Sequence, residues 1–135
     1  MLSSIEAYSQ FIYTILDTTP SIQRHTVRIY PRGALVGVLE GTIEFGQGIV
    51  LRVYERIDFA RRRIMTYSYE VWRGQERLYW YDPWEHPDNP DLAISFPHHK
   101  HIPPDIKHHR IPAPELSFTK PNLPFLIEEI ERTLL

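Results

Sequence analysis

The sequence predicts an α+β fold, in which an antiparallel meander sheet of four to six strands carries an N-terminal and a C-terminal helix on one face. Apolar residues recur at helical spacing near both ends of the chain, they alternate with polar residues in the middle, and a Pro/His-rich loop precedes the second helix. A chain of 135 residues with 42% hydrophobic residues suffices for one core. We therefore expect a single domain over residues 1–135.

The first expected element is an amphipathic helix over residues 2–16. Ser3 or Ser4 is a suitable N-cap, and residues 17–20, which end in proline, stop the helix. Apolar side chains recur along one face of this helix, at Ile5, Tyr8, Ile12 and Ile15. This stripe predicts that the helix packs against the sheet.

Alternation of apolar and polar residues predicts the strands of the sheet. Their expected ranges are 25–30, 34–45, 49–59, 63–72 and 76–82, with turns at residues 46–48 and 73–74. Gly37 and Gly41 lie inside one of these strands, where glycine indicates a bulge or a closely packed neighbour.

From residue 83 onward, the sequence predicts a long loop instead of further sheet. Ten of the twelve prolines lie between residues 83 and 124, and a loop of this length in a compact domain is usually functional or disordered. The chain returns to a helix over residues 123–135, where one face is apolar, at Leu126, Ile127, Ile130 and Leu134.

Composition narrows the class of protein. A formal net charge of −2 argues against a protein that binds nucleic acid through its overall charge, so any such activity needs a local basic patch. The absence of cysteine excludes disulfides, thiolate metal ligands and a cysteine nucleophile. There is no apolar run near 18 residues, and Glu6 interrupts the pattern of a signal peptide. We expect a cytoplasmic protein without a membrane segment.

Five of the seven histidines lie in the segment FPHHKHIPPDIKHHR, residues 96–110. Three interpretations compete: a surface loop with incidental histidines, a metal site, and a catalytic acid–base site. The HxxH spacing of His98 and His101 suits zinc, copper, nickel or iron. Further ligands for such a site are available at Asp82, His86, His108 and His109. Prolines at 97, 103 and 104 exclude a helix that presents ligands at i and i+4.

We adopt the acid–base interpretation as the leading hypothesis. Imidazole takes up and gives off a proton near neutral pH, as RNA cleavage through the ribose 2′-hydroxyl requires. His99 and His101 would be base and acid in either order, and Lys100 or an arginine would stabilise the phosphate. This mechanism needs no metal ion and no other cofactor.

The expected site also includes residues of the strands before the loop. The tyrosines would position RNA or orient an imidazole, and packing between strands is the alternative explanation for them. The arginines would bind phosphate, and a solvated strand end is the alternative for the run at 61–63. The expected catalytic residues are Tyr67, Tyr69, Tyr81, Asp82, His98, His99, Lys100 and His101. The expected substrate-binding residues are Arg61, Arg63, Arg77 and His86.

The run YSYEVWRGQERLYWYDPWEHP, followed by FPHHKH, resembles the TumE-like toxins of prokaryotic toxin–antitoxin modules. In that family a Y-x-Y strand precedes an R-Y-D-N-A-P-H-H-like segment and a T-F-P-H-H-K-H signature. Tyr67 and Tyr69 match the first element, and residues 96–101 match the third. The second is approximated by Tyr81, Asp82 and His86.

Two departures from the family pattern fall in the second element. Trp80 stands where the family tends to have arginine before Tyr-Asp, and residues 83–85 replace an Asn-Ala-Pro-like continuation. The first departure removes a cation from the expected site, so Arg77 or the arginines at 61–63 would have to take its place.

The resemblance implies the toxin of a toxin–antitoxin module, and an endoribonuclease by analogy with other small sheet-based toxins. It implies a DNA-binding antitoxin as partner and RNA as substrate, with no membrane contact, and we consider a homodimer as a further assembly. Two other classes of function stay open: a non-catalytic module that binds a protein through the histidine segment, and a metal-dependent hydrolase that uses the same histidines.

Overall fold

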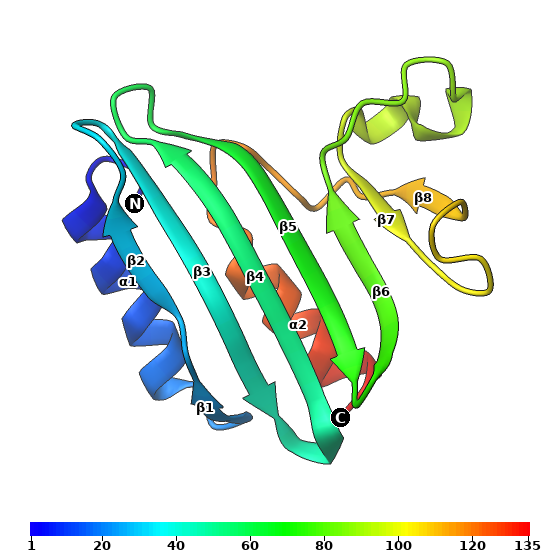
Figure 1. Cartoon of the computed structure of the whole chain (residues 1–135), viewed down its shortest axis with the longest axis horizontal. Coiled ribbons are helices and arrows are strands. Elements are labelled where there is room, and N and C mark those ends of the chain that lie inside the picture. The colour runs from blue at the N-terminus through cyan, green and yellow to red at the C-terminus, as the bar shows by residue number, and fades with distance from the viewer.

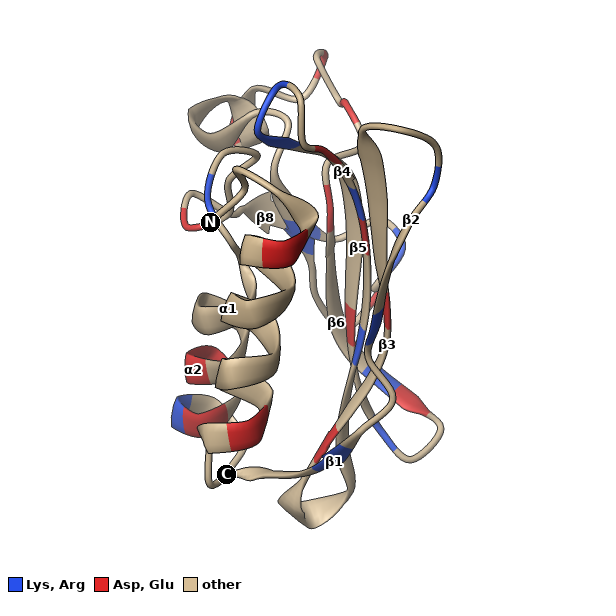
Figure 2. Ribbon diagram, turned by 90° about the vertical axis from the view of Figure 1, so that its left-hand side faces the viewer, with Lys and Arg blue, Asp and Glu red and all other residues tan.

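An eight-stranded antiparallel sheet forms the body of the protein, as a computed structural model of residues 1–135 shows (Figure 1). The order of its strands is β1-β3-β4-β5-β6-β7-β8, and β2 also pairs with β3. The helices α1 (Ile5–Thr18) and α2 (Leu123–Thr133) cover the same face of this sheet, and the other face carries no helix (Figure 2). The α+β prediction, with both helices on one face, is confirmed.

Helix α1 has the N-cap and the buried stripe that its sequence predicts, but it covers Ile5–Thr18 instead of residues 2–16. Ser4 is the N-cap, and its hydroxyl accepts a hydrogen bond of 3.0 Å from the backbone N–H of Ala7. The buried side chains of the helix are Tyr8, Ile12 and Leu16, one per helical turn. This stripe lies against the sheet and forms part of the core.

Four long strands form the centre of the sheet, where the alternating pattern predicted them. They are β3 (Val36–Phe45), β4 (Ile49–Asp58), β5 (Arg63–Arg73) and β6 (Glu76–Asp82). A single 3₁₀ turn, η1 (Gly46–Gly48), connects β3 to β4. Alternate residues of β4 and β5 are buried against the helices, which explains the period of two in the sequence.

The predicted strand at residues 25–30 is divided into two shorter strands. These are β1 (Ile22–His25) and β2 (Arg28–Pro31), and both pair with β3. The division lies opposite Gly41, where a Cβ atom would come within 2.6 Å of the Cα of Val27. The expectation of a closely packed neighbour at this glycine is confirmed.

The predicted count of four to six strands was too low. Besides the division of the first strand, two strands occur in the segment that was expected to be a loop. They are β7 (His99–His101) and β8 (Arg110–Pro112), and β7 pairs with β6 (Figure 1). A strand of three residues is too short to show periodicity, and at the edge of a sheet it tolerates neighbouring prolines. The rest of this segment contains the short 3₁₀ helix η2 (Pro90–Ser95).

Neither helix combines the length and the apolar character that a membrane span requires. The core lies between the helices and the covered face of the sheet. The helix-free face at the β6–β7 edge is therefore where polar side chains can gather without disturbing the core.

Candidate functional site

The register between β6 and β7 decides which of the expected residues meet. Residues directly opposite each other on neighbouring strands point to the same face of a sheet. The pairs are Asp82 with His99, Tyr81 with Lys100, and Trp80 with His101. Tyr81 is buried against α2, because its hydroxyl donates to Glu129 of that helix. His99 and His101 therefore lie on the helix-free face, and Lys100 lies on the opposite one.

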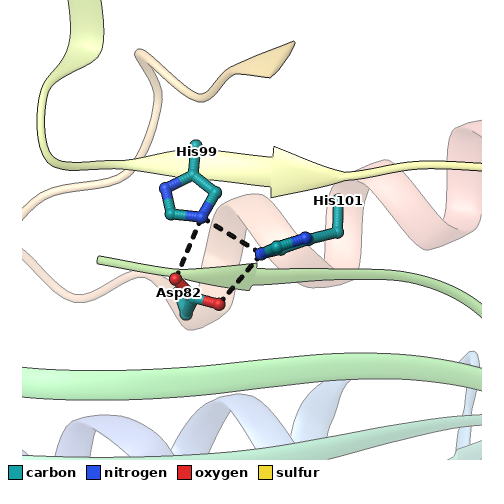
Figure 3. A group of neighbouring side chains, drawn as sticks. All are labelled: Asp82, His99 and His101. Carbon is teal, nitrogen blue, oxygen red and sulfur yellow. Dashed lines mark hydrogen bonds and ion pairs between the residues drawn. The ribbon is translucent and has the colours of Figure 1, made fainter. Parts of the chain in front are cut away.

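Three side chains converge on the helix-free face, and we call Asp82, His99 and His101 the Asp82 centre (Figure 3). The Nε2 atom of His99 lies 3.0 Å from Oδ1 of Asp82, and that of His101 lies 3.0 Å from Oδ2. The two Nε2 atoms are 3.1 Å apart. One carboxylate thus faces two imidazole nitrogens that also face each other.

Backbone carbonyls fix the orientation and the tautomer of both rings. The Nδ1 atom of His99 lies 3.1 Å from the carbonyl oxygen of Pro97, and that of His101 lies 3.0 Å from the carbonyl oxygen of Ile106. A carbonyl oxygen only accepts, so each Nδ1 carries a proton and donates it. In the neutral rings the lone pairs of Nε2 therefore point into the centre. No ring nitrogen is left free for a substrate.

Asp82 is ionised and held in place from both sides. The indole N–H of Trp80 donates to its Oδ2 at 2.8 Å, and the backbone N–H of Trp84 donates to its Oδ1 at 2.9 Å. Burial acts to raise the pKa of Asp82, but its contacts with His101 and His99 and the hydrogen bond from Trp80 outweigh it. The net effect lowers the pKa of this carboxyl well below its ordinary value.

The centre is reached from the side of its carboxylate. The side chains of His99 and His101 are 1% and 5% exposed, whereas that of Asp82 is 24% exposed. The three residues that follow Asp82 in the chain, Pro83, Trp84 and Glu85, line a surface hollow of about 360 Å³. A ligand would reach the centre at the exposed part of Asp82.

Aromatic and basic side chains border the centre. The ring of Trp80 stacks on His101 with 3.8 Å between centroids, and the guanidinium of Arg77 lies 3.6 Å from the centroid of Trp80. His86 packs edge-to-face on His99, with 4.9 Å between centroids. Arg77 and His86, two of the expected substrate-binding residues, are therefore neighbours of the centre.

Arg110 is a cation at this site that the sequence did not predict. It lies opposite His101 on β8, so it shares the helix-free face, and it makes no ion pair with a carboxylate. Burial lowers the pKa of His86, and the positive charge of Arg110 lowers it further. Only the pairing of β8 with β7 brings Arg110 here, and three residues of strand give no signal for that pairing in the sequence.

The other expected catalytic residues lie on the helix-covered face, apart from the centre. Lys100 forms an ion pair of 3.0 Å with Glu129, which also accepts from Tyr81. Tyr67 is hydrogen bonded to His98 and stacks on its ring. The hydroxyl of Tyr69 donates to the buried Glu55 at 2.6 Å. These contacts link the sheet to the core and to α2, so the structure does not bring these residues together with the two imidazoles.

Arg61 and Arg63 lie at the turn between β4 and β5 and have partners of their own. Arg61 forms an exposed ion pair with Asp58 at 3.7 Å, and the guanidinium of Arg63 lies 5.2 Å from the ring centroid of Phe118. Neither contacts the Asp82 centre. The arginine that borders the centre through Trp80 is Arg77.

The arrangement of the Asp82 centre has the composition of a metal-binding site as well as of an acid–base site. Two imidazole nitrogens and a carboxylate form a ligand set found around zinc and iron. Every ring nitrogen of His99 and His101 already has a partner. To act as acid or base on a substrate, one of these nitrogens must first break its contact with Asp82 or with a backbone carbonyl.

A comparison with protein families gives one match. The profile of the family described as Toxin TumE matches residues 12–134, which is nearly the whole chain. No curated protein and no solved structure gives a significant match. The matched range includes all three residues of the Asp82 centre.

Proposed function

Since this chain belongs to the TumE toxin family, for which an antitoxin partner is implied, we propose that its toxic activity is the cleavage of RNA at the Asp82 centre. The observation that carries the proposal is the convergence of Asp82, His99 and His101 at 3.0–3.1 Å, with the carboxylate of Asp82 partly exposed. Ionisable groups that converge at an accessible place are typical of catalytic sites.

The chemistry is transfer of a phosphodiester bond to the neighbouring ribose oxygen. The 2′-oxygen bonds to phosphorus while the bond from phosphorus to the 5′-oxygen breaks. The centre accepts the proton of the 2′-hydroxyl and returns a proton to the 5′-oxygen. The products are a 2′,3′-cyclic phosphate and a 5′-hydroxyl, and no water is consumed. Arg110 is the nearby cation for the charge that develops on the phosphate.

A row of alternating cations and indole rings supports RNA as the substrate. On the helix-free face, the guanidinium of Arg52 lies 4.6 Å from the ring centroid of Trp72. Arg77 contacts both indoles, at 5.7 Å from Trp72 and 3.6 Å from Trp80, and Trp80 stacks on His101 of the centre. Single-stranded nucleic acid is bound by such combinations of basic and aromatic groups. Glu70 pairs with Arg77 at 3.2 Å within this row, so Arg52 is its arginine without a carboxylate partner.

The test compares RNA cleavage by the wild type and the Asp82→Asn variant, with products separated on denaturing gels. We expect the variant to lose about 100-fold or more of the rate, the range for loss of acid–base catalysis. The exposed His108→Ala variant is the control and should cleave like the wild type. Toxicity that persists in Asp82→Asn would contradict the proposal and favour a protein-binding function of the same surface.

A further inference from the structure

We propose that the Asp82 centre binds one divalent transition-metal ion. The ligands are Nε2 of His99, Nε2 of His101 and a carboxylate oxygen of Asp82. The role of this ion in RNA cleavage rests on the proposed function, whereas ion binding rests on the geometry of the three side chains.

The distances between the ligand atoms fit an ion placed among them. Bonds from zinc to nitrogen or oxygen are about 2.1 Å, which in octahedral or tetrahedral geometry separates neighbouring ligand atoms by about 3.0–3.4 Å. In the protein, the two contacts between carboxylate and imidazole are 3.0 Å, and the two imidazole nitrogens are 3.1 Å apart. Each imidazole faces a different oxygen of the carboxylate, and all the ligand atoms lie within 4.8 Å of one another, so an ion among them needs only small side-chain adjustments.

A bound cation would remove a repulsion among the three side chains of the centre. Both Nδ1 atoms donate to backbone carbonyls, so in neutral rings two nitrogen lone pairs face each other and a carboxylate. Groups that present lone pairs to one another at 3.0–3.1 Å repel each other. A bound cation is attracted by all three groups at once.

The groups behind the ligands are those that support metal sites. Histidines that bind metals generally donate their other ring N–H to a carbonyl or carboxylate, and ligating carboxylates are themselves hydrogen bonded. Here the carbonyls of Pro97 and Ile106 hold the rings, and the N–H groups of Trp80 and Trp84 hold Asp82. Both ligand-bearing strands belong to the sheet, which gives the site a rigid base.

The three ligands determine which class of ion is preferred, and they leave a coordination position open for water. Two imidazoles favour zinc, copper, iron or nickel over magnesium and calcium, which prefer oxygen ligands. Three protein ligands leave at least one position for water, on the side where Asp82 is exposed. A bound hydroxide would take the proton of the 2′-hydroxyl, become water, and return a proton to the departing 5′-oxygen, so that hydroxide is regenerated.

Binding is measured on the full chain after treatment with EDTA and dialysis, without RNA. Zn²⁺ is titrated by calorimetry, and Co²⁺ by the visible absorption of the bound ion. We expect one ion per chain and an affinity at least about 10-fold lower in Asp82→Asn and in His101→Gln. His108→Ala is the control, because His108 pairs with Asp105 on the surface at 3.0 Å and represents an incidental His–Asp pair.

The folded state is checked by circular dichroism and by thermal unfolding with and without Zn²⁺. The ion should raise the Tm of the wild type and of His108→Ala, but not that of Asp82→Asn. Wild-type protein that takes up no ion, or Asp82→Asn protein that binds as tightly as the wild type, would overturn the inference. An ion bound without RNA cleavage would refute only the proposed function. Cleavage in EDTA by metal-free protein would refute only the role of the ion in cleavage.

Discussion

In the run from His98 to His101, each side chain has a distinct environment because the chain is extended there. His99 and His101 point to the helix-free face and meet Asp82, whereas Lys100 points to the helix side and meets Glu129. The residue types alone predicted all three members of the centre. They did not predict that Lys100 points to the opposite face from the two histidines. Side chains alternate between faces only in a strand, and this segment was expected to be a loop.

Because Lys100 lies on the helix side, we predict that it stabilises the fold. From the sequence alone, Lys100 was instead expected to stabilise the phosphate of the substrate. In Lys100→Met, the mostly buried carboxylate of Glu129 loses its cation and keeps only the hydrogen bond from Tyr81. We expect the free energy of unfolding in urea to fall by about 2 kcal/mol, with the affinity for Zn²⁺ unchanged. Lys107→Met, at an exposed position, is the control. A Lys100→Met variant that is as stable as the wild type but loses RNA cleavage would restore the catalytic role.

At the scale of elements, a buried carboxylate joins parts of the fold that are distant in sequence. Glu55 of β4 accepts hydrogen bonds from Tyr8 of α1 and Tyr69 of β5. The hydroxyl of Tyr69 in turn accepts from Asn122, the residue before α2. Long amphipathic elements such as β4 could be predicted from the sequence, since burial imposes a period on them. Their connection through one glutamate could not, because nothing local marks the partners.

Glu55 also makes the stability of the fold depend on pH. Burial raises the pKa of Glu55 above its ordinary 4.5, although the hydrogen bonds from Tyr69 and Tyr8 act to lower it. The folded state thus binds the proton more tightly than the unfolded state. Its contribution to stability is complete below pH 4.5 and is lost as the pH rises through the raised pKa.

We therefore expect the wild type to lose stability relative to Glu55→Gln as the pH rises from 4.5 toward neutrality. Glutamine keeps the size of the side chain and does not titrate, so its cost is a constant offset. Urea unfolding of both proteins at several pH values measures the difference in the free energy of unfolding. If the two curves stay parallel across this range, Glu55 titrates alike in the folded and unfolded states.

At the scale of the whole molecule, the two faces of the sheet separate the core from the site that we propose for function. The face covered by the helices (Figure 2) holds the core, and the helix-free face holds the Asp82 centre and the row of Arg52, Trp72 and Arg77. The sequence predicted the layers correctly from the amphipathic helices. It placed the arginines at 61–63 in the site and missed Arg110, because membership of this face depends on which strands pair, and the pairing of β7 with β6 and β8 spans long connections.

If RNA lies along the helix-free face, removing one indole from the row should weaken binding and leave the chemistry intact. In Trp72→Ala, two guanidinium groups lose the ring they pack on and a base loses a stacking surface. We expect KM for single-stranded RNA to rise about 10-fold, the effect of losing one stacking contact of 1–3 kcal/mol, with kcat and the affinity for Zn²⁺ unchanged. Leu35→Ala truncates an exposed side chain between β2 and β3 and is the control. A fall in kcat with KM unchanged would show instead that Trp72 supports the geometry of the centre, because only an effect on the reacting groups lowers the rate at saturating RNA.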